Sequence, residues 1–141
     1  MDARAYGRVW LPFLGGLVAI WALFRLGSAP YRLSQWFGLA LALLGLAGAT
    51  LARWTLGSSF SITPQARQLV TRGVYSKLRN PIYVFGTIFI AGLILIIGRP
   101  FLWIVLAASI VMQTLRARRE AHVLEAKFGD DYRRYRDQTW F

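Results

Sequence analysis

The sequence predicts an all-α protein: a polytopic membrane helical bundle of about four transmembrane helices plus a C-terminal amphipathic cytosolic helix. Two observations support this fold class. The 141-residue chain is 56% hydrophobic, with its apolar residues gathered in uncharged runs, and the basic residues behind its formal charge of +11 lie between and after those runs. A basic soluble domain that binds nucleic acid would not contain such long uncharged runs. We therefore expect a single integral-membrane domain over residues 1–141, with membrane lipids around it and no nucleic-acid partner.

The first half of the chain predicts two spanning helices, over about residues 9–26 and 33–53. Residues 33–52 carry no charge, and 20 residues cross a hydrocarbon layer of about 30 Å at about 1.5 Å per residue. Small residues recur along this second helix at helical spacing, which predicts close packing against another helix. They are Gly38, Ala42, Gly45 and Ala49.

The second half predicts two shorter spans, over residues 82–98 and 101–115, joined by a tight hairpin at Gly98-Arg99-Pro100. Between the second and third spans, Thr63-Pro64 predicts the start of a short surface helix that runs to about residue 70. Gly73 is expected to interrupt it.

The residues after position 115 form a charged tail, which holds seven of the 17 basic residues and five of the six acids. Its apolar residues recur at spacings of three and four, as on one face of a helix. We expect Gly129 to interrupt this helix and Asp130 to begin the next turn. The tail can lie on the membrane surface or cover residues 69–80, and we favour the second arrangement.

The basic residues also predict orientation, since 14 of the 17 lie in the N-terminal segment, the central segment and the tail. Positive residues concentrate on the cytoplasmic side, so both termini and the central segment are expected there. The preference for arginine over lysine, 15 against two, is typical of a high-GC bacterial genome, which favours a bacterial inner membrane.

The central segment, residues 69–86, holds the first group of candidate functional residues: Tyr75, Arg79, Asn80 and Tyr83. Proline at position 81 favours a helix that begins there, and the free amides of a helix N-terminus attract anions. Arg79, Asn80 and this helix start can hold a carboxylate, while the two tyrosines can line a pocket.

The tail, over residues 116–135, holds the second group. Arg116 and Glu120 lie four residues apart on one helix and can form an inward-facing pair, and Leu124 and Phe128 can form an apolar wall. From the residues alone, Arg116 is better explained as a snorkelling or lipid-headgroup contact and Glu120 as its surface partner. His122, two residues from Glu120, points to a different face.

The order of these residues resembles the two motifs of a family of integral-membrane methyltransferases. The motifs here are Leu-Val, Gly-x-Tyr and Arg-Asn-Pro-x-Tyr, followed by Arg-x-x-x-Glu-Ala-x-x-Leu-x-x-x-Phe-Gly-x-x-Tyr-x-x-Tyr. The family includes isoprenylcysteine carboxyl methyltransferases and phospholipid N-methyltransferases. It usually has proline at Val74, glycine at Phe85 and glutamate at Ala121.

This resemblance implies S-adenosylmethionine as the cofactor and methyl transfer to a lipophilic acceptor that enters from the bilayer, either a prenylcysteine-type carboxylate or a phospholipid amine. It implies that Arg116 and Glu120 are catalytic. It also implies that the cofactor contacts the central-segment residues named above, together with Leu124 and Phe128.

Two alternatives from other classes remain: a nicotinamide-dependent membrane reductase of related architecture and a small four-helix transporter. The chain has no Gly-x-Gly-x-x-Gly motif that would favour a reductase, and it has no carboxylate within a span, which a cation exporter needs. With no cysteine and one histidine, no metal site is expected.

Overall fold

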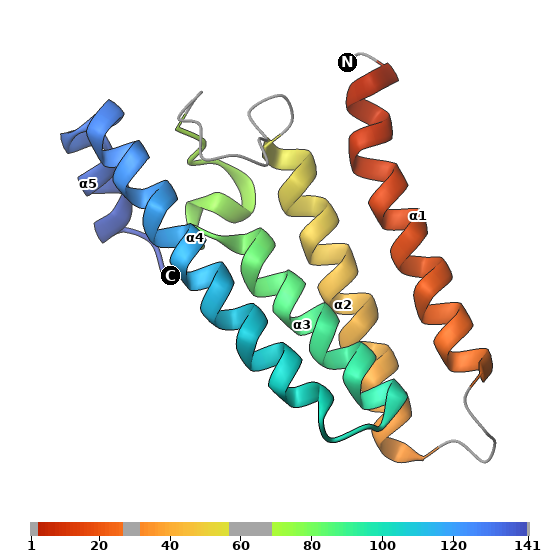
Figure 1. Ribbon diagram of the computed structural model, residues 1–141. Coiled ribbons are helices and arrows are strands. Elements are labelled where there is room, and N and C mark those ends of the chain that lie inside the picture. Colours follow the sequence, from red (N-terminus) through yellow and green to blue (C-terminus); the bar gives the residue numbers. More distant parts are fainter. Residues whose placement is uncertain (1–2, 27–31, 57–68, 141) are drawn as a thin grey trace.

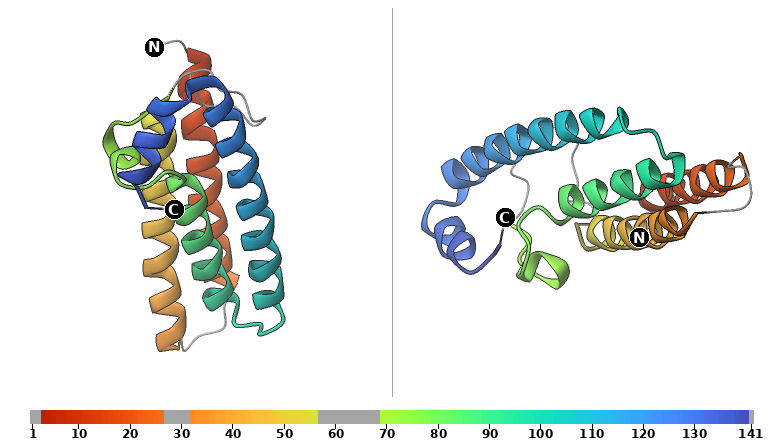
Figure 2. Two further views of the ribbon diagram at one scale, coloured as in Figure 1. Left: turned by 90° about the vertical axis from the view of Figure 1, so that its left-hand side faces the viewer. Right: turned by 90° about the horizontal axis from the view of Figure 1, so that it is seen from below.

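The structure is a computed structural model and describes residues 3–26, 32–56 and 69–140. Helices α1 (Ala3–Leu26), α2 (Leu33–Leu56), α3 (Pro81–Ile97) and α4 (Leu102–Phe128) run up and down side by side, and the short helix α5 (Asp130–Asp137) packs at one end (Figures 1 and 2). A 3-10 helix, η2 (Gly73–Ser76), precedes α3. No strand occurs among the described residues, which confirms the all-α prediction.

Helices α2 and α3 form the most extensive interface of the bundle. Gly38, Ala42 and Gly45 of α2 are buried against α3. A Cβ atom added to Gly45 would overlap the Phe89 backbone, and one added to Gly92 would overlap the Ala42 backbone. The two backbones are therefore in direct contact, and the predicted small-residue stripe serves packing.

Helix α1 packs against both α2 and α3 through an apolar face that includes Ile20. Ile20 is buried with Leu46 and Ile96, and Phe13 and Leu17 pack around them. Near the opposite end of α1, Trp10 meets Trp54 of α2 edge to face, with 5.9 Å between the ring centroids.

The outer surface of the bundle is strongly apolar. Large hydrophobic side chains are exposed along α1, α2 and α4, for example Trp21, Phe37 and Ile104. Within the described ranges, α2 is the one helix that has both the length and the apolar composition needed to cross a membrane, while the apolar stretches Trp10–Leu23 and Pro81–Ile97 are shorter.

The predicted fourth span and the predicted tail helix are parts of one helix, because α4 continues without a break from Leu102 to Phe128. Residues 116–128 contain alanine, arginine, glutamate, lysine and leucine, all good helix formers, and no glycine or proline. The break comes at Gly129, whose φ of 51° ends α4, and α5 begins at Asp130, as predicted.

Of two other predicted features, the hairpin at Gly98 is confirmed and the surface helix lies mostly outside the described residues. Gly98 takes a left-handed conformation with φ of 69°, and its amide donates to the Ile94 carbonyl, which confirms the tight α3–α4 hairpin. The predicted helix over residues 64–70 lies mostly outside the described residues, and Leu69 and Val70 are not helical.

The end of the bundle that carries α5 also holds the start of α1, the end of α2 and the start of α3 (Figure 1). The two segments that carry the candidate residues, 69–86 and 116–135, therefore meet at the same end. The end of α1, the start of α2 and the α3–α4 connection lie at the other end.

Candidate functional site

The first element of the site is the entry into α3. Pro81 is fully buried at the first helical position, and the Asn80 carbonyl accepts the amides of Tyr83 at 3.0 Å and Val84 at 3.2 Å. Proline fits here because its missing N–H would have no partner within the helix. Asn80 itself makes no side-chain capping bond, which leaves its amide group available at the helix N-terminus.

A hydrogen bond joins the two candidate segments directly. The Tyr83 hydroxyl, on the first turn of α3, donates to Oε1 of Glu120 on α4 at 2.6 Å, across 37 positions of sequence. Both side chains are half-buried. A bond this short to a carboxylate is a strong one and fixes both groups.

The predicted pair between Arg116 and Glu120 does not form. Both residues lie in the described part of the chain, and no ion pair joins them, because the Glu120 carboxylate turns to the Tyr83 hydroxyl while Arg116 is exposed. The charge of Arg116 still acts on the Tyr83 phenol. The two predicted catalytic residues therefore share a helix and a region, without direct contact.

Residues 132–140, which we term the C-terminal latch, cover the loop that precedes α3. The buried Tyr135 hydroxyl donates to the Tyr75 carbonyl at 2.7 Å. The Trp140 amide donates to the Lys77 carbonyl at 2.8 Å, and the Arg79 amide donates to the Trp140 carbonyl at 3.0 Å. The tail thus contacts residues 75–79, within the loop that it was predicted to cover, and adds one strand-like pairing at Leu78.

Arg79 lies beneath this latch among tyrosines. Its charge acts on Tyr132 and Tyr135, while its Nε atom is buried with no hydrogen-bond partner among the described residues. A buried guanidinium N–H without an acceptor is costly. The arrangement therefore suits an anionic group placed next to Arg79.

Burial also controls the three tyrosines around this position. It raises the pKa of Tyr135 to about 12, and it raises the pKa values of Tyr75 and Tyr132 as well, with the Arg79 charge opposing the rise at Tyr132. All three phenols keep their protons at neutral pH and remain hydrogen-bond donors.

Comparison with known families agrees with this arrangement. A family model described as phospholipid methyltransferase matches residues 33–131, which include both candidate segments up to Asp131. The chain belongs to the phospholipid methyltransferase family. No curated protein matches the chain.

In this methyltransferase, Leu124 and Phe128 lie half-buried on α4, one and two turns beyond Glu120. The Lys127 ammonium lies 5.6 Å from the Phe128 ring. Both residues therefore share the helix that carries Glu120, between Glu120 and the turn at Gly129.

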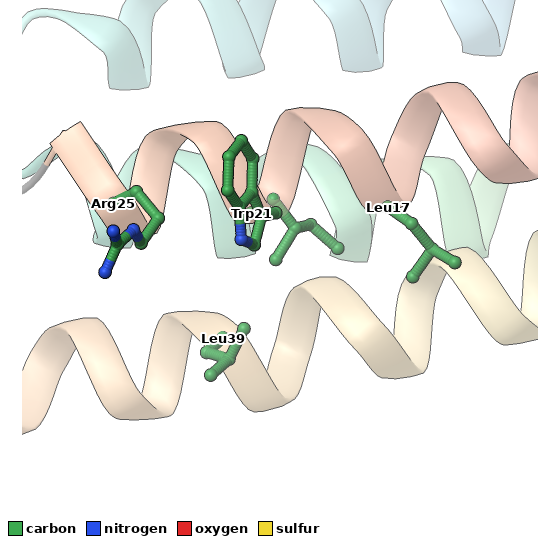
Figure 3. A pocket seen from close by; sticks show the side chains of 5 residues that line it. Leu17, Trp21, Arg25 and Leu39 are labelled. Atoms are coloured by element: carbon green, nitrogen blue, oxygen red, sulfur yellow. The ribbon is translucent and has the colours of Figure 1, made fainter.

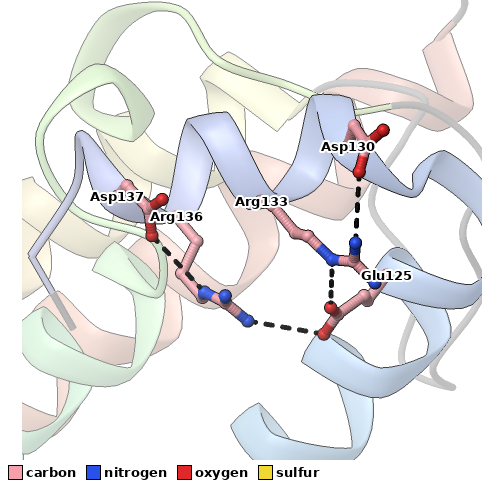
Figure 4. Close-up of polar contacts among 5 residues, drawn as sticks. All are labelled: Glu125, Asp130, Arg133, Arg136 and Asp137. Carbon is pink, nitrogen blue, oxygen red and sulfur yellow. Dashed lines mark hydrogen bonds and ion pairs between the residues drawn. The ribbon is translucent and has the colours of Figure 1, made fainter.

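Sequence reasoning missed the ion pairs that hold α5 against α4 (Figure 4). Arg133 Nε lies 2.8 Å from one Glu125 oxygen and Arg136 Nη1 lies 3.4 Å from the other, while Arg133 also reaches Asp130 at 3.1 Å. The hydrogen bond from Arg133 holds the pKa of Glu125 below its ordinary value. The high density of acidic and basic residues after residue 124 indicates such ion pairs, but the turn at Gly129 determines which of these residues meet.

A separate groove lies between α1 and α2, at the end of the bundle away from the methyltransferase motifs (Figure 3). Its lining is apolar apart from one guanidinium and comprises Leu17, Ile20, Trp21, Arg25 and Leu39. It offers no group suited to methyl transfer.

Proposed function

We propose that the chain is an S-adenosylmethionine-dependent methyltransferase that acts on a lipophilic acceptor at the membrane surface. The observation that carries this proposal is the 2.6 Å bond between Tyr83 and Glu120, which brings one residue of each motif into contact. The latch adds support, because it ties the Tyr75–Arg79 loop to the end of α5.

The residues present fit the cofactor. Arg79, Asn80 and the α3 N-terminus would hold its carboxylate, and the unpartnered Arg79 Nε supplies the donor that such a group needs. Tyr75 and Tyr83 would line the pocket. Leu124 and Phe128 would form the apolar wall for the adenine.

When bound, S-adenosylmethionine supplies an electrophilic methyl group on a positively charged sulfur. The protein aligns the acceptor with that methyl group and excludes water. Glu120 accepts the proton that an amine acceptor must lose, and the Tyr83 hydroxyl fixes the orientation of its carboxylate. Because this site provides a base, we favour a phospholipid amine over a prenylcysteine carboxylate, which is already nucleophilic.

Arg116 would bind the anionic part of the acceptor. It is exposed, lies one turn before Glu120 on α4, and has a guanidinium that forms paired hydrogen bonds with phosphate or carboxylate oxygens. This role requires no pair with Glu120, in agreement with the observed geometry.

The membrane setting follows from the surface of the bundle. Exposed large apolar side chains along α1, α2 and α4 would be unfavourable in water and suit four spans in lipid, with the shorter helices accommodated by local bilayer thinning. The end that carries α5 and the motifs would face the cytoplasm, since most basic residues gather there.

Calorimetric titration of S-adenosylmethionine into the detergent-purified protein tests this function. The parent should bind, and Glu120→Gln should weaken binding or abolish methyl transfer to phosphatidylethanolamine. Glu125→Gln, five residues further along α4 in an exposed ion pair, is the matched control and should leave both nearly unchanged. Absence of binding by folded parent protein would overturn the proposal.

A further inference from the structure

A cluster of three polar side chains lies between α3 and α4, within the apolar part of the bundle. Thr87 Oγ1 lies 2.9 Å from the Tyr83 carbonyl and 3.2 Å from Gln113 Oε1, and Gln113 Nε2 donates to Ser109 Oγ at 3.0 Å. We term Thr87, Gln113 and Ser109 the polar cluster. It is separate from the Tyr83–Glu120 bond and the latch, and the proposed chemistry does not use it.

The polar cluster does not satisfy all of its own donors. The Gln113 amide nitrogen carries two hydrogens and donates one to Ser109. The Ser109 hydroxyl accepts that bond, and its own proton has no acceptor among the described residues. Within lipid there is no water to take up such donors. Polar residues that served only to join two helices would be expected to pair completely.

The position of the polar cluster relative to Glu120 is fixed by α4. Gln113 lies seven residues before Glu120, so it shares the same helix face at about 10 Å toward the apolar interior. The α4 residues buried on this side, Leu106 and Ala117, flank it. The three cluster residues are half-buried, so part of each remains accessible.

This spacing matches the order of groups along a glycerophospholipid. With the amine at Glu120 and the phosphate near Arg116, the glycerol and its ester carbonyls are the next polar groups toward the hydrocarbon. A prenylcysteine, in contrast, has only hydrocarbon beyond its thioether. Unused N–H and O–H donors at this depth therefore suit ester oxygens.

We infer that the polar cluster is a binding subsite for the ester carbonyl oxygens of a diacyl glycerophospholipid acceptor. The Gln113 amide and the Ser109 hydroxyl donate to these oxygens, and Thr87 holds the Gln113 side chain in position. This inference rests on the proposed function and narrows its substrate class to ester-linked glycerolipids.

Binding of two matched lipids tests the subsite. One is diacyl phosphatidylethanolamine and the other is its diether analogue, in which methylene groups replace the ester carbonyls, each presented in mixed micelles to the purified protein. We expect the parent to bind the diester about three- to tenfold more tightly, the effect of about one hydrogen bond. Gln113→Met should remove this preference without changing the affinity for the diether.

Two further substitutions complete the test. Thr87→Val and Ser109→Ala should each reduce the preference and also serve if Gln113→Met does not fold. Thr114→Val, which removes a hydroxyl bonded to the Ile110 carbonyl at an exposed site on α4, should retain it. Equal binding of both lipids by the parent, or an unchanged preference in Gln113→Met, would overturn the inference.

Methyl transfer measured on the same samples separates this inference from the proposed function. Methylation of both lipids with equal efficiency would reject the subsite and retain the methyltransferase. A preference for the diester without methylation of any lipid would reject the proposed function and retain the subsite.

Discussion

The two faces of α3 are packed in opposite ways. Toward α2, glycine and alanine bring backbone against backbone, with Gly45 beside Phe89 and Gly92 beside Ala42. Toward α4 the interface is sparse and includes half-buried hydrogen bonds, from Tyr83 to Glu120 and between Thr87 and Gln113. Close apolar packing resists separation, whereas polar groups can exchange partners with a ligand. We therefore term the α2 side the scaffold side, and the α4 side, which carries the proposed site, the functional side.

Breaking the scaffold side should have the largest effect. Gly45→Ala places a methyl group against the α3 backbone, where no flexible side chain can give way. Overpacking costs about 1–3 kcal/mol, more than the gain of about 1 kcal/mol in helix propensity. We expect a lower thermal unfolding midpoint in detergent.

Gly15→Ala is the control for this substitution, because a Cβ at Gly15 has no neighbour within 4 Å. It should leave the midpoint unchanged or raise it. Equal destabilisation by both would contradict the proposed contrast between the two glycines.

Breaking the functional side should affect activity more than the fold. Tyr83→Phe removes the hydroxyl that donates to Glu120, a bond to a carboxylate worth about 1.5–3 kcal/mol. We expect methyl transfer to fall about tenfold or more, since each 1.4 kcal/mol corresponds to a factor of about ten. The backbone amides of α2 and α3 should keep their protection from hydrogen exchange. Loss of that protection in Tyr83→Phe would show that the α2 and α4 sides of α3 are not independent.

Two substitutions at Trp140 form a matched test of the latch. Trp140 contributes two main-chain bonds, and its side chain is 77% exposed. Trp140→Pro removes the amide that bonds the Lys77 carbonyl and should weaken binding of S-adenosylmethionine by about 1 kcal/mol. Trp140→Ala keeps that amide and should bind like the parent. Titration of both variants checks this, and similar weakening in both would assign the effect to the side chain.

The smallest expected effect is the pH dependence of stability that arises from Glu125 at the α4–α5 junction. The pKa of Glu125 is depressed in the folded state by Arg133, so its contribution to stability is present above its unfolded pKa and is lost as pH falls through the lower folded value. Its unfolded pKa is about 4.3, so the loss should occur below about pH 4. Thermal midpoints of the parent and Glu125→Gln, measured from pH 6 to pH 3, should converge at the acidic end.

Sequence patterns were sufficient where one local rule decides the structure. Uncharged runs predicted the all-α class, positive-φ glycines ended α3 and α4, and Pro81 began α3. The partners of Glu120 and Glu125 could not be predicted, because several cations and phenols compete at similar spacing. Their choice depends on how α3 approaches α4 and how far the chain turns at Gly129.

The latch also bears on the order of events during synthesis. The α2–α3 interface is complete in sequence at Ile97, whereas Tyr135, whose hydroxyl bonds the Tyr75 carbonyl, comes only in α5. The scaffold can therefore assemble while α5 is still being translated, and the loop around Tyr75 reaches its final form only after the latch has emerged. A ribosome-bound intermediate would therefore contain the scaffold without the latch.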